Sequence, residues 1–263
     1  MATTTGFLDH NGGKLYWEAA GAGPNVVLVH GFSLDTRMWD DQFDVLAERF
    51  RVARYDARGF GKSTTPTGPF SHMDDLAALL DAQGMDRASV VGLSMGGRIA
   101  ADFALTHPHR LDKLVLIDAG ISGQTMSPEF SKINADLRAN ARAGHVNSTK
   151  ELWVRSPLFA PAAAIPEVRA RLRTIVHDWS GWQWVSTDPQ LPLDPPAWGR
   201  LRDVAAETLV LVGELDLPDF HAAAGHVVAS APNARKVVIA GAGHMSNMEA
   251  PAAVNAALLG FLG

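Results

Sequence analysis

The chain has 263 residues, of which 47% are hydrophobic and 19% are charged, and its formal net charge at pH 7 is -5. A chain of this length can form one large α/β domain, or a core with a small inserted subdomain. The net charge is weakly negative, and the sequence contains no run of like charges. Both observations argue against nucleic acid or an anionic membrane as a partner. The absence of cysteine excludes disulfides, thiol catalysis and cysteine-ligated metal.

Residues 1–6 lack the basic region and apolar stretch of a secretory signal, and no apolar run is long enough to span a bilayer. We therefore expect a cytoplasmic protein, either a monomer or a homodimer, that has no membrane partner.

The first predicted elements are two strands, residues 6–10 and 14–18, on either side of Asn11-Gly12-Gly13. This turn sequence is typical of a β-hairpin. The later predicted strands are mostly continuous apolar runs, which are typical of strands covered on both faces in a parallel sheet. They are residues 25–29, 51–55, 88–91, 113–117, 208–212 and 236–240.

Between these strands, apolar residues recur at helical spacing in residues 39–50, 73–80 and 250–262. Alternation of strands and helices predicts an α/β fold with right-handed crossovers. We expect a mostly parallel eight-stranded sheet that is flanked by helices.

Residues 120–200 contain no strand-like run. This segment predicts a helical cap inserted between the sixth and seventh strands, with residues 1–119 and 201–263 forming the core. Its helical stretches are residues 128–143, 149–155 and 166–179, which are separated by proline-rich turns.

Five of the seven tryptophans lie in the cap. Most are expected to pack the cap onto the core, because tryptophan contributes strongly to apolar burial. Some of them can instead line an apolar pocket for the acyl group of a substrate. The candidate pocket residues are Phe32, Trp153, Trp179, Trp182 and Trp184.

Ser94 lies at the centre of Gly92-Leu93-Ser94-Met95-Gly96, between the predicted strand at 88–91 and a helical stretch. This pattern indicates a nucleophile elbow, a sharp turn that lifts a serine hydroxyl clear of the sheet. The two glycines are needed because a side chain there would collide with the crossing strand and helix.

A serine nucleophile needs a base, and in elbow-type enzymes the histidine follows the acid in the chain. Of the ten histidines, His221, His226 and His244 come late enough, and the first two fall in a probable helix. His244 follows the last predicted strand in a glycine-rich loop at the same sheet edge as Ser94. We therefore expect His244 to be the base.

The acid should follow the seventh strand, where the chain offers Glu214, Asp216 and Asp219. Asp216 is the preferred candidate, because Glu214 is expected beside the strand end and Asp219 in the first turn of the next helix. Asp118, at the end of the sixth strand, is a further alternative. The acid would hold the histidine tautomer and stabilise the imidazolium.

Negative charge that develops on a carbonyl oxygen needs preorganised donors. The elbow supplies the backbone N–H of Met95, and the loop after the third strand is expected to supply that of Phe32. Phe32 can alternatively serve only as a pocket wall. His30 is expected to be a structural hydrogen-bonding residue.

With these motifs the chain resembles the α/β-hydrolases of the esterase, lactonase and haloperoxidase-like group. The resemblance rests on the elbow at 92–97, Asp216 and other motifs along the core. These are His30-Gly31-Phe32, Asp56-Ala57-Arg58-Gly59-Phe60-Gly61-Lys62-Ser63, and Gly243-His244 with Glu249-Ala250-Pro251. The overall pattern is most similar to 3-oxoadipate enol-lactonase-like and small carboxylesterase proteins.

The resemblance also limits the chemistry. Epoxide hydrolases and haloalkane dehalogenases of this fold carry aspartate at the elbow, so Ser94 argues against both. Carbon–carbon bond hydrolases share the Ser-Met-Gly-Gly elbow but usually show a glycine-rich loop where this chain has Ser33-Leu34-Asp35.

We expect a serine hydrolase that cleaves an ester or lactone of a small, largely apolar substrate through an acyl-enzyme, without a metal or organic cofactor. The histidines show no metal-ligand spacing. Perhydrolysis, carbon–carbon bond hydrolysis or cyclisation at the same site are alternatives. A hydrolase-fold ligand sensor without enzymatic activity is another, because fold alone does not settle function.

Overall fold

The computed structural model describes residues 2–263 and contains an eight-stranded sheet. The order of the strands in this sheet is β1-β2-β4-β3-β5-β6-β7-β8. β2 is antiparallel to its neighbours β1 and β4, and all the other neighbouring strands are parallel. The sheet is therefore mostly parallel, as the sequence predicts. The strands are β1 (Thr4–His10), β2 (Gly13–Ala20), β3 (Asn25–Val29), β4 (Arg51–Tyr55), β5 (Ala88–Leu93), β6 (Leu111–Ile117), β7 (Glu207–Gly213) and β8 (Ala234–Ile239).

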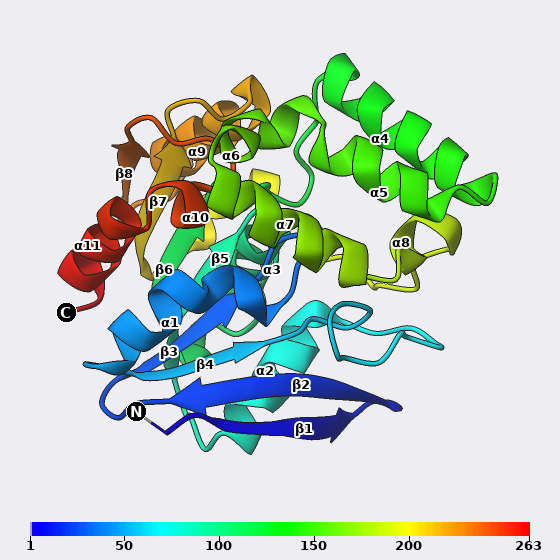
Figure 1. Cartoon of the computed structure of the whole chain (residues 1–263). Helices are drawn as coiled ribbons and strands as arrows, with labels where there is room; N and C mark the ends of the chain where they lie inside the picture. The colour runs from blue at the N-terminus through cyan, green and yellow to red at the C-terminus, as the bar shows by residue number, and fades with distance from the viewer. Residues whose placement is uncertain (1) are drawn as a thin grey trace.

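Helices pack on both faces of the sheet. Figure 1 shows α1 and α11 in front of the strands and α2 and α3 behind them. The core helices are α1 (Asp40–Ala47), α2 (His72–Ala82), α3 (Met95–Thr106), α9 (Pro218–Ser230), α10 (Ser246–Glu249) and α11 (Pro251–Leu262). None of the helices within residues 2–263 combines the length and apolar character needed to cross a membrane.

Local sequence signals explain where several helices begin. The Ser71 hydroxyl caps α2 by accepting a hydrogen bond from the Asp74 N–H at 3.2 Å. The helix predicted over 39–50 is shorter in the structure, because α1 ends at Ala47 and a 3₁₀ turn precedes its first residue, Asp40. That turn, Thr36–Trp39, is capped by the Asp35 carboxylate.

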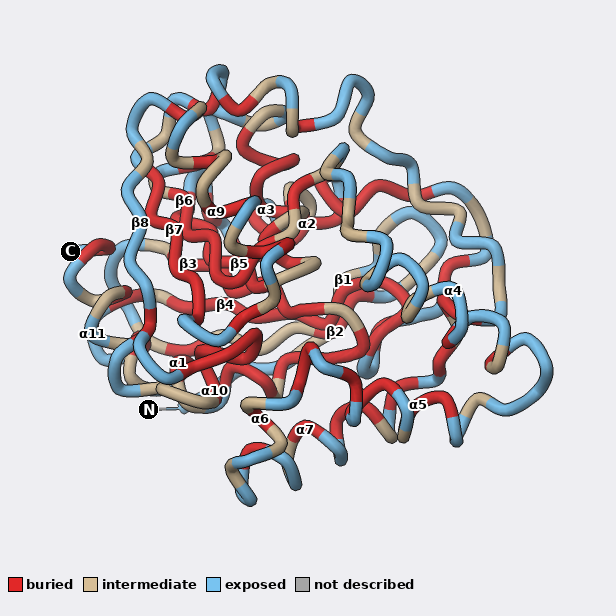
Figure 2. The backbone as a smooth tube through the Cα atoms, turned by 90° about the horizontal axis from the view of Figure 1, so that it is seen from above, coloured by how far each residue is buried: buried red, intermediate tan, exposed pale blue. Residues whose placement is uncertain are grey.

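The central strands are buried along most of their length, and in Figure 2 they form the red centre of the molecule. β8 differs from the expectation that all late strands are covered on both faces, because it is the last strand of the sheet. Its valines Val237 and Val238 are 40% and 48% exposed.

The cap, residues 120–200, contains helices, turns and an isolated β-bridge from Gln190 to Phe70, and its helices α4 to α7 lie together above the sheet in Figure 1. They are α4 (Pro128–Arg142), α5 (Val146–Val154), α6 (Ala160–Ala164), α7 (Pro166–Asp178) and α8 (Trp182–Val185). Buried and exposed residues alternate along α5 and α7 in Figure 2, as expected for helices with one face on the core.

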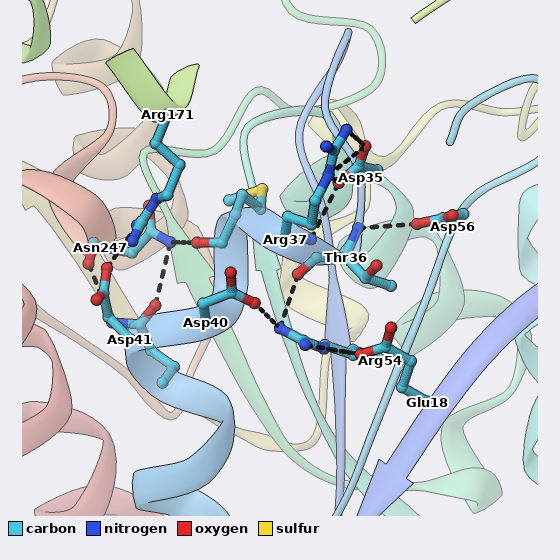
Figure 3. A network of polar contacts seen from close by, with 12 residues as sticks. Glu18, Asp35, Thr36, Arg37, Asp40, Asp41, Arg54, Asp56, Arg171 and Asn247 are labelled. Carbon is cyan, nitrogen blue, oxygen red and sulfur yellow. Dashed lines mark hydrogen bonds and ion pairs between the residues drawn. The ribbon is translucent and has the colours of Figure 1, made fainter. Parts of the chain in front are cut away.

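Ion pairs hold α7 of the cap to the start of α1. Arg171 contacts Asp41 at 2.5 Å, and Arg37 bridges Asp35 and Asp178 at 2.6 and 2.8 Å. Figure 3 shows this region together with Arg54, which pairs with carboxylates on β2 and α1. The cap is therefore anchored beside the loop that follows β3.

Candidate active site

Ser94 occupies a strained turn between β5 and α3. Its backbone has φ 54° and ψ -112°, in the region that L residues rarely adopt. A Cβ on Gly92 would meet the Gly96 carbonyl, and a Cβ on Gly96 would meet the Val29 carbonyl. Only glycine permits this approach, so the local sequence folds as an elbow.

Three side chains from three loops meet at the elbow. His244 Nε2 lies 2.9 Å from Ser94 Oγ, and His244 Nδ1 lies 3.0 and 3.1 Å from the two carboxylate oxygens of Asp216. These loops follow β5, β7 and β8, whose carboxyl ends meet at one edge of the parallel sheet. With Nδ1–H donating to Asp216, Nε2 is free to accept the proton of Ser94.

The other acid candidates lie in different places. Glu214 accepts a hydrogen bond from the Gly241 N–H at 2.8 Å. Asp219 accepts hydrogen bonds from the N–H and hydroxyl of Ser127, and so joins α9 to the start of α4. Neither makes a hydrogen bond or ion pair with His244 in the described part of the chain.

Asp118 is buried beside the same site but contacts the loops rather than the imidazole. Its carboxylate accepts hydrogen bonds from the Gly213 N–H at 2.7 Å and from the N–H and hydroxyl of Ser246. Burial first, and then the charge of Asp216, raise the pKa of Asp118 to about 8. Asp118 thereby ties together the loops that carry Asp216 and His244.

Carboxylates dominate the electrostatics around His244. Burial lowers its pKa, but the charge and hydrogen bond of Asp216, together with the charge of Glu249, outweigh that effect and raise the pKa above its ordinary value. Glu249 also holds the loop, because it accepts hydrogen bonds from the Gly243 and Met245 N–H groups at 2.6 and 3.0 Å. Glu249 is part of the motif that follows His244, but the sequence pattern by itself predicts no contact for it.

The two residues expected to supply oxyanion donors, Phe32 and Met95, line the same cavity as Ser94. The N–H groups of Phe32 and Met95 make no hydrogen bond within residues 2–263, although both residues line the cavity at Ser94. His30 supports the loop that carries the Phe32 N–H. Its Nδ1 contacts the Gly31 carbonyl at 2.8 Å, and its Nε2 accepts a hydrogen bond from the Ala57 N–H at 2.8 Å. Two unpaired N–H groups are thus available to a ligand oxygen.

A cavity of about 400 Å³ opens at Ser94 and His244. Of the candidate pocket residues, Phe32 and Trp153 line it, whereas Trp179, Trp182 and Trp184 do not. A substrate-binding role for these three residues stays a prediction, and they lie outside the lining of this cavity.

The physical reason is that two of these tryptophans pack behind Phe32 instead. The Phe32 ring centroid lies 5.0 Å from that of Trp179 and 6.2 Å from that of Trp184. Trp179 and Trp184 are buried against each other with a centroid distance of 4.5 Å. Trp182 lies near Gly59, outside the cavity lining. The cluster therefore fixes the loop that carries the Phe32 N–H.

Polar side chains make up much of the rest of the lining, which differs from the expectation of a largely apolar pocket. They come from the loops after β4 and β6, from α2, α3 and α4, and from the segment around 183–190, and their spacing in the sequence carries no common motif. They are Arg58, His72, Arg98, Gln124, Asn134, Arg138, Gln183, Asp188 and Gln190. Among residues 2–263, no three histidine, aspartate or glutamate side chains gather in a way that could hold a metal ion.

Comparisons with known proteins agree with this fold. Residues 26–257 match the family model described as "Alpha/beta hydrolase family". A curated relative from Caulobacter sp. (strain K31), named "Putative carbamate hydrolase RutD", is 32% identical over 94% of this chain and 95% of its own length.

Two solved structures superpose over nearly the whole chain. A hydrolase from Pseudomonas aeruginosa PA01 has a TM-score of 0.81 and 31% identity, and each chain is covered to 98%. The enol-lactonase from Burkholderia xenovorans LB400 has a TM-score of 0.82 and 25% identity, over 98% of this chain and 99% of that one.

Proposed function

This chain belongs to the alpha/beta hydrolase family, and we propose that it is a serine hydrolase that cleaves a carboxylic ester or lactone of a small substrate. The hydrogen-bonded series Ser94, His244, Asp216 carries this proposal. Such a series is the arrangement that turns a weakly nucleophilic hydroxyl into an effective nucleophile.

In the first half of the proposed reaction, His244 Nε2 takes the Ser94 proton while Ser94 Oγ bonds to the substrate carbonyl carbon. The carbonyl oxygen becomes an oxyanion and accepts hydrogen bonds from the N–H groups of Phe32 and Met95. His244 then gives the proton to the leaving oxygen, the carbon–oxygen bond breaks, and an acyl group remains on Ser94.

In the second half, His244 takes a proton from water, whose oxygen bonds to the acyl carbon. The bond between that carbon and Ser94 Oγ then breaks, and the proton returns from His244 to Ser94. Asp216 stays ionised throughout and holds Nδ1–H, so that Nε2 faces the serine. For a lactone, the leaving oxygen remains attached to the released hydroxy acid.

Two features beyond the triad support this proposal. The cavity volume of about 400 Å³ suits a small substrate. Two similar proteins carry hydrolase or lactonase names, the enol-lactonase from Burkholderia xenovorans LB400 and the relative named "Putative carbamate hydrolase RutD".

The test is labelling with a fluorophosphonate probe, followed by peptide mass spectrometry. We expect one labelled serine, Ser94, and no labelling of Ser94→Ala. The matched control is Ser122→Ala, which removes another serine hydroxyl from the lining of the same cavity and should still be labelled. Labelling of Ser94→Ala at the wild-type rate would contradict the proposal.

Product analysis separates the proposed activity from its alternatives at the same site. Hydrolysis of an ester and lactone panel that is unchanged by added peroxide favours the proposed activity over perhydrolysis. A protein that turns over no panel member, yet is stabilised by one of them, would instead be a ligand sensor.

A further inference from the structure

Ser33, the residue after Phe32, is held through its hydroxyl from two sides. The indole N–H of Trp153 donates a hydrogen bond to Ser33 Oγ at 2.7 Å, and Ser33 Oγ donates one to the Phe32 carbonyl at 2.5 Å. Ser33 is fully buried, and within residues 2–263 its hydroxyl makes no other hydrogen bond. These contacts form a hydrogen-bonded series that runs from α5 of the cap to the loop after β3.

The backbone at Ser33 is strained, which points to a use for its side chain. Its φ of 63° lies in the left-handed region, which glycine adopts freely and other residues rarely adopt. The turn is tight, because the Leu34 N–H donates to the Gly31 carbonyl at 3.3 Å. A serine at a position that suits glycine indicates that the hydroxyl compensates for the strained backbone.

The Ser33 hydroxyl acts on one of the two peptide units that meet at the α-carbon of Phe32. The Phe32 N–H belongs to the same planar unit as the Gly31 carbonyl, which His30 Nδ1 contacts at 2.8 Å. The next unit begins with the Phe32 carbonyl, which accepts the Ser33 hydroxyl. Both units are therefore held, and this restrains the rotations that would change the direction of the Phe32 N–H.

Trp153 influences where the Ser33 hydroxyl points. An indole N–H can only donate, so Ser33 Oγ is the acceptor toward Trp153 and its own proton points to another acceptor. The acceptor that the structure gives it is the Phe32 carbonyl. In such a series each hydrogen bond polarises and strengthens the next one. Loss of the indole N–H is therefore expected to weaken the contact between Ser33 and Phe32 as well.

Ser33 and Trp153 differ in their relation to the cavity. Trp153 lines it and packs edge-on against the Phe32 ring at a centroid distance of 6.1 Å, whereas Ser33 does not line it. An effect of the Ser33 hydroxyl on the reaction therefore has to pass through the loop. Trp153 reaches the same loop from the cap, so that cap and loop are joined at the residue next to the expected oxyanion donor.

We propose that Ser33 and Trp153 are positioning residues, which hold the Phe32 N–H in the direction needed to stabilise the oxyanion. The cap thereby contributes to the chemical step through this hydrogen-bonded series, in addition to enclosing the substrate. Removal of an oxyanion donor typically lowers kcat about 10²- to 10³-fold. A donor that is misdirected rather than removed should have a smaller effect, a loss of about 10- to 100-fold in kcat.

This inference rests on the proposed function, and its kinetic test uses the best panel ester. Ser33→Gly removes the hydroxyl and suits the positive φ, and Trp153→Phe removes the indole N–H but keeps an aromatic ring. We expect each variant to lower kcat about 10- to 100-fold, and Ser33→Gly to leave KM nearly unchanged, since the oxyanion forms only in the transition state. The double variant should lose no more than the more affected single variant, because both changes break one series.

Trp198→Phe is the matched control for the change at Trp153. Trp198 is another tryptophan of the cap, stacks on His226 at a centroid distance of 3.9 Å and does not line the cavity. This variant makes the same substitution without touching the series, and it should keep the wild-type kcat.

Binding of a trifluoromethyl ketone separates an effect on the oxyanion from an effect on general binding. Ser94 Oγ bonds to the carbonyl carbon of this inhibitor, the Ser94 proton goes to His244, and the carbonyl oxygen becomes an oxyanion. In Ser33→Gly the affinity of the ketone should fall by about the same factor as kcat/KM. The affinity of the product acid, which forms no oxyanion adduct, should not change.

Labelling of Ser94 by a fluorophosphonate does not require turnover of an ester. The phosphoryl oxygen gains negative charge as Ser94 attacks, so Ser33→Gly should slow the labelling about 10-fold. If the wild type hydrolyses no ester but is labelled, and Ser33→Gly slows this labelling, the proposed function fails and the positioning role stands. If esters are hydrolysed and neither single variant lowers kcat, the positioning role fails and the proposed function stands.

Further outcomes would overturn the positioning role. Additive losses in the double variant would show that the two residues act independently. A wild-type kcat in Ser33→Gly, together with a raised KM in Trp153→Phe, would mark Trp153 as a substrate contact alone. A lower Tm of Ser33→Gly without a lower kcat would mark Ser33 as a structural residue. A wild type that is neither labelled at Ser94 nor active on any ester would overturn both proposals.

Discussion

The carboxylate of Asp118 accepts two hydrogen bonds from Ser246, at 3.3 Å from the N–H and at 2.5 Å from the hydroxyl, and Ser246 lies two residues after His244. The same carboxylate accepts the Gly213 N–H at 2.7 Å, just before the loop that carries Asp216. One side chain at the end of β6 therefore holds the two loops that bring acid and base together.

This contact predicts a pH-dependent effect of Asp118→Asn on stability. Burial raises the pKa of Asp118 to about 8 in the folded protein, so between about pH 4 and 8 the folded state keeps a proton that the unfolded state releases. Stability of the wild type therefore falls as pH rises through this window. The side chain of an asparagine at this position can still accept a hydrogen bond from the Gly213 N–H and donate one to the Ser246 hydroxyl, but it has no carboxyl group to ionise.

Urea unfolding at several pH values from 5 to 8 measures the effect. The free energy of unfolding of Asp118→Asn, minus that of the wild type, should increase with pH by at most about 1.4 kcal/mol per pH unit. A difference that stays constant over this range would show that Asp118 is ionised in the folded protein.

The pH profile of catalysis should reflect the protonation of the His244 imidazole. The base must be neutral to take the Ser94 proton, so kcat/KM should fall as the pH drops through a value above the ordinary 6.5 of histidine, because nearby carboxylates raise this pKa. Glu249→Gln removes one of these charges and should shift the acid limb to lower pH. Glu214→Gln, on a neighbouring loop, should leave the acid limb in place, and a flat profile from pH 5 to 8 would rule out His244.

Substitution of the acid separates the candidates that follow β7. Asp216→Asn should lower kcat by about 10⁴, because the amide no longer favours the tautomer with Nδ1–H. Glu214→Gln and Asp219→Asn change acids on the same stretch of chain and should reduce kcat far less. Steady-state kinetics on the best panel ester provides the measurement, and equal losses in all three variants would contradict the role of Asp216.

The elbow predicts a sharp difference between two glycine substitutions. Gly96→Ala places a methyl group against the Val29 carbonyl, so we expect a loss of stability together with loss of fluorophosphonate labelling. Gly225→Ala lies in α9 with open space around its Cβ position, and should gain about 0.5–1 kcal/mol. Thermal unfolding of both variants checks the pair; similar Tm shifts would contradict the close packing at Gly96.

Much of the fold follows from patterns that are local in the sequence. Strand and helix periodicities are read over a few residues, and they predict the mostly parallel sheet, the helical segment at 120–200 and the helices that flank the strands. The elbow is local at Gly92, whose Cβ would meet the Gly96 carbonyl, whereas Gly96 meets the Val29 carbonyl of the neighbouring strand β3. The sequence alone does not decide whether Asp118 or Asp216 pairs with the histidine, because both follow strands that end at the same edge of the sheet.

Only the tertiary structure decides which side chains from distant segments become neighbours. It places Asp216 against His244 and Asp118 against Ser246, and it turns Trp179 and Trp184 toward Phe32 instead of the cavity. Within residues 2–263, it also leaves Arg98 Nε and His72 Nδ1 without a hydrogen-bond partner at the cavity. Each of these outcomes depends on burial and on contacts made across long stretches of chain, and neither quantity is encoded in the spacing of residues along one element.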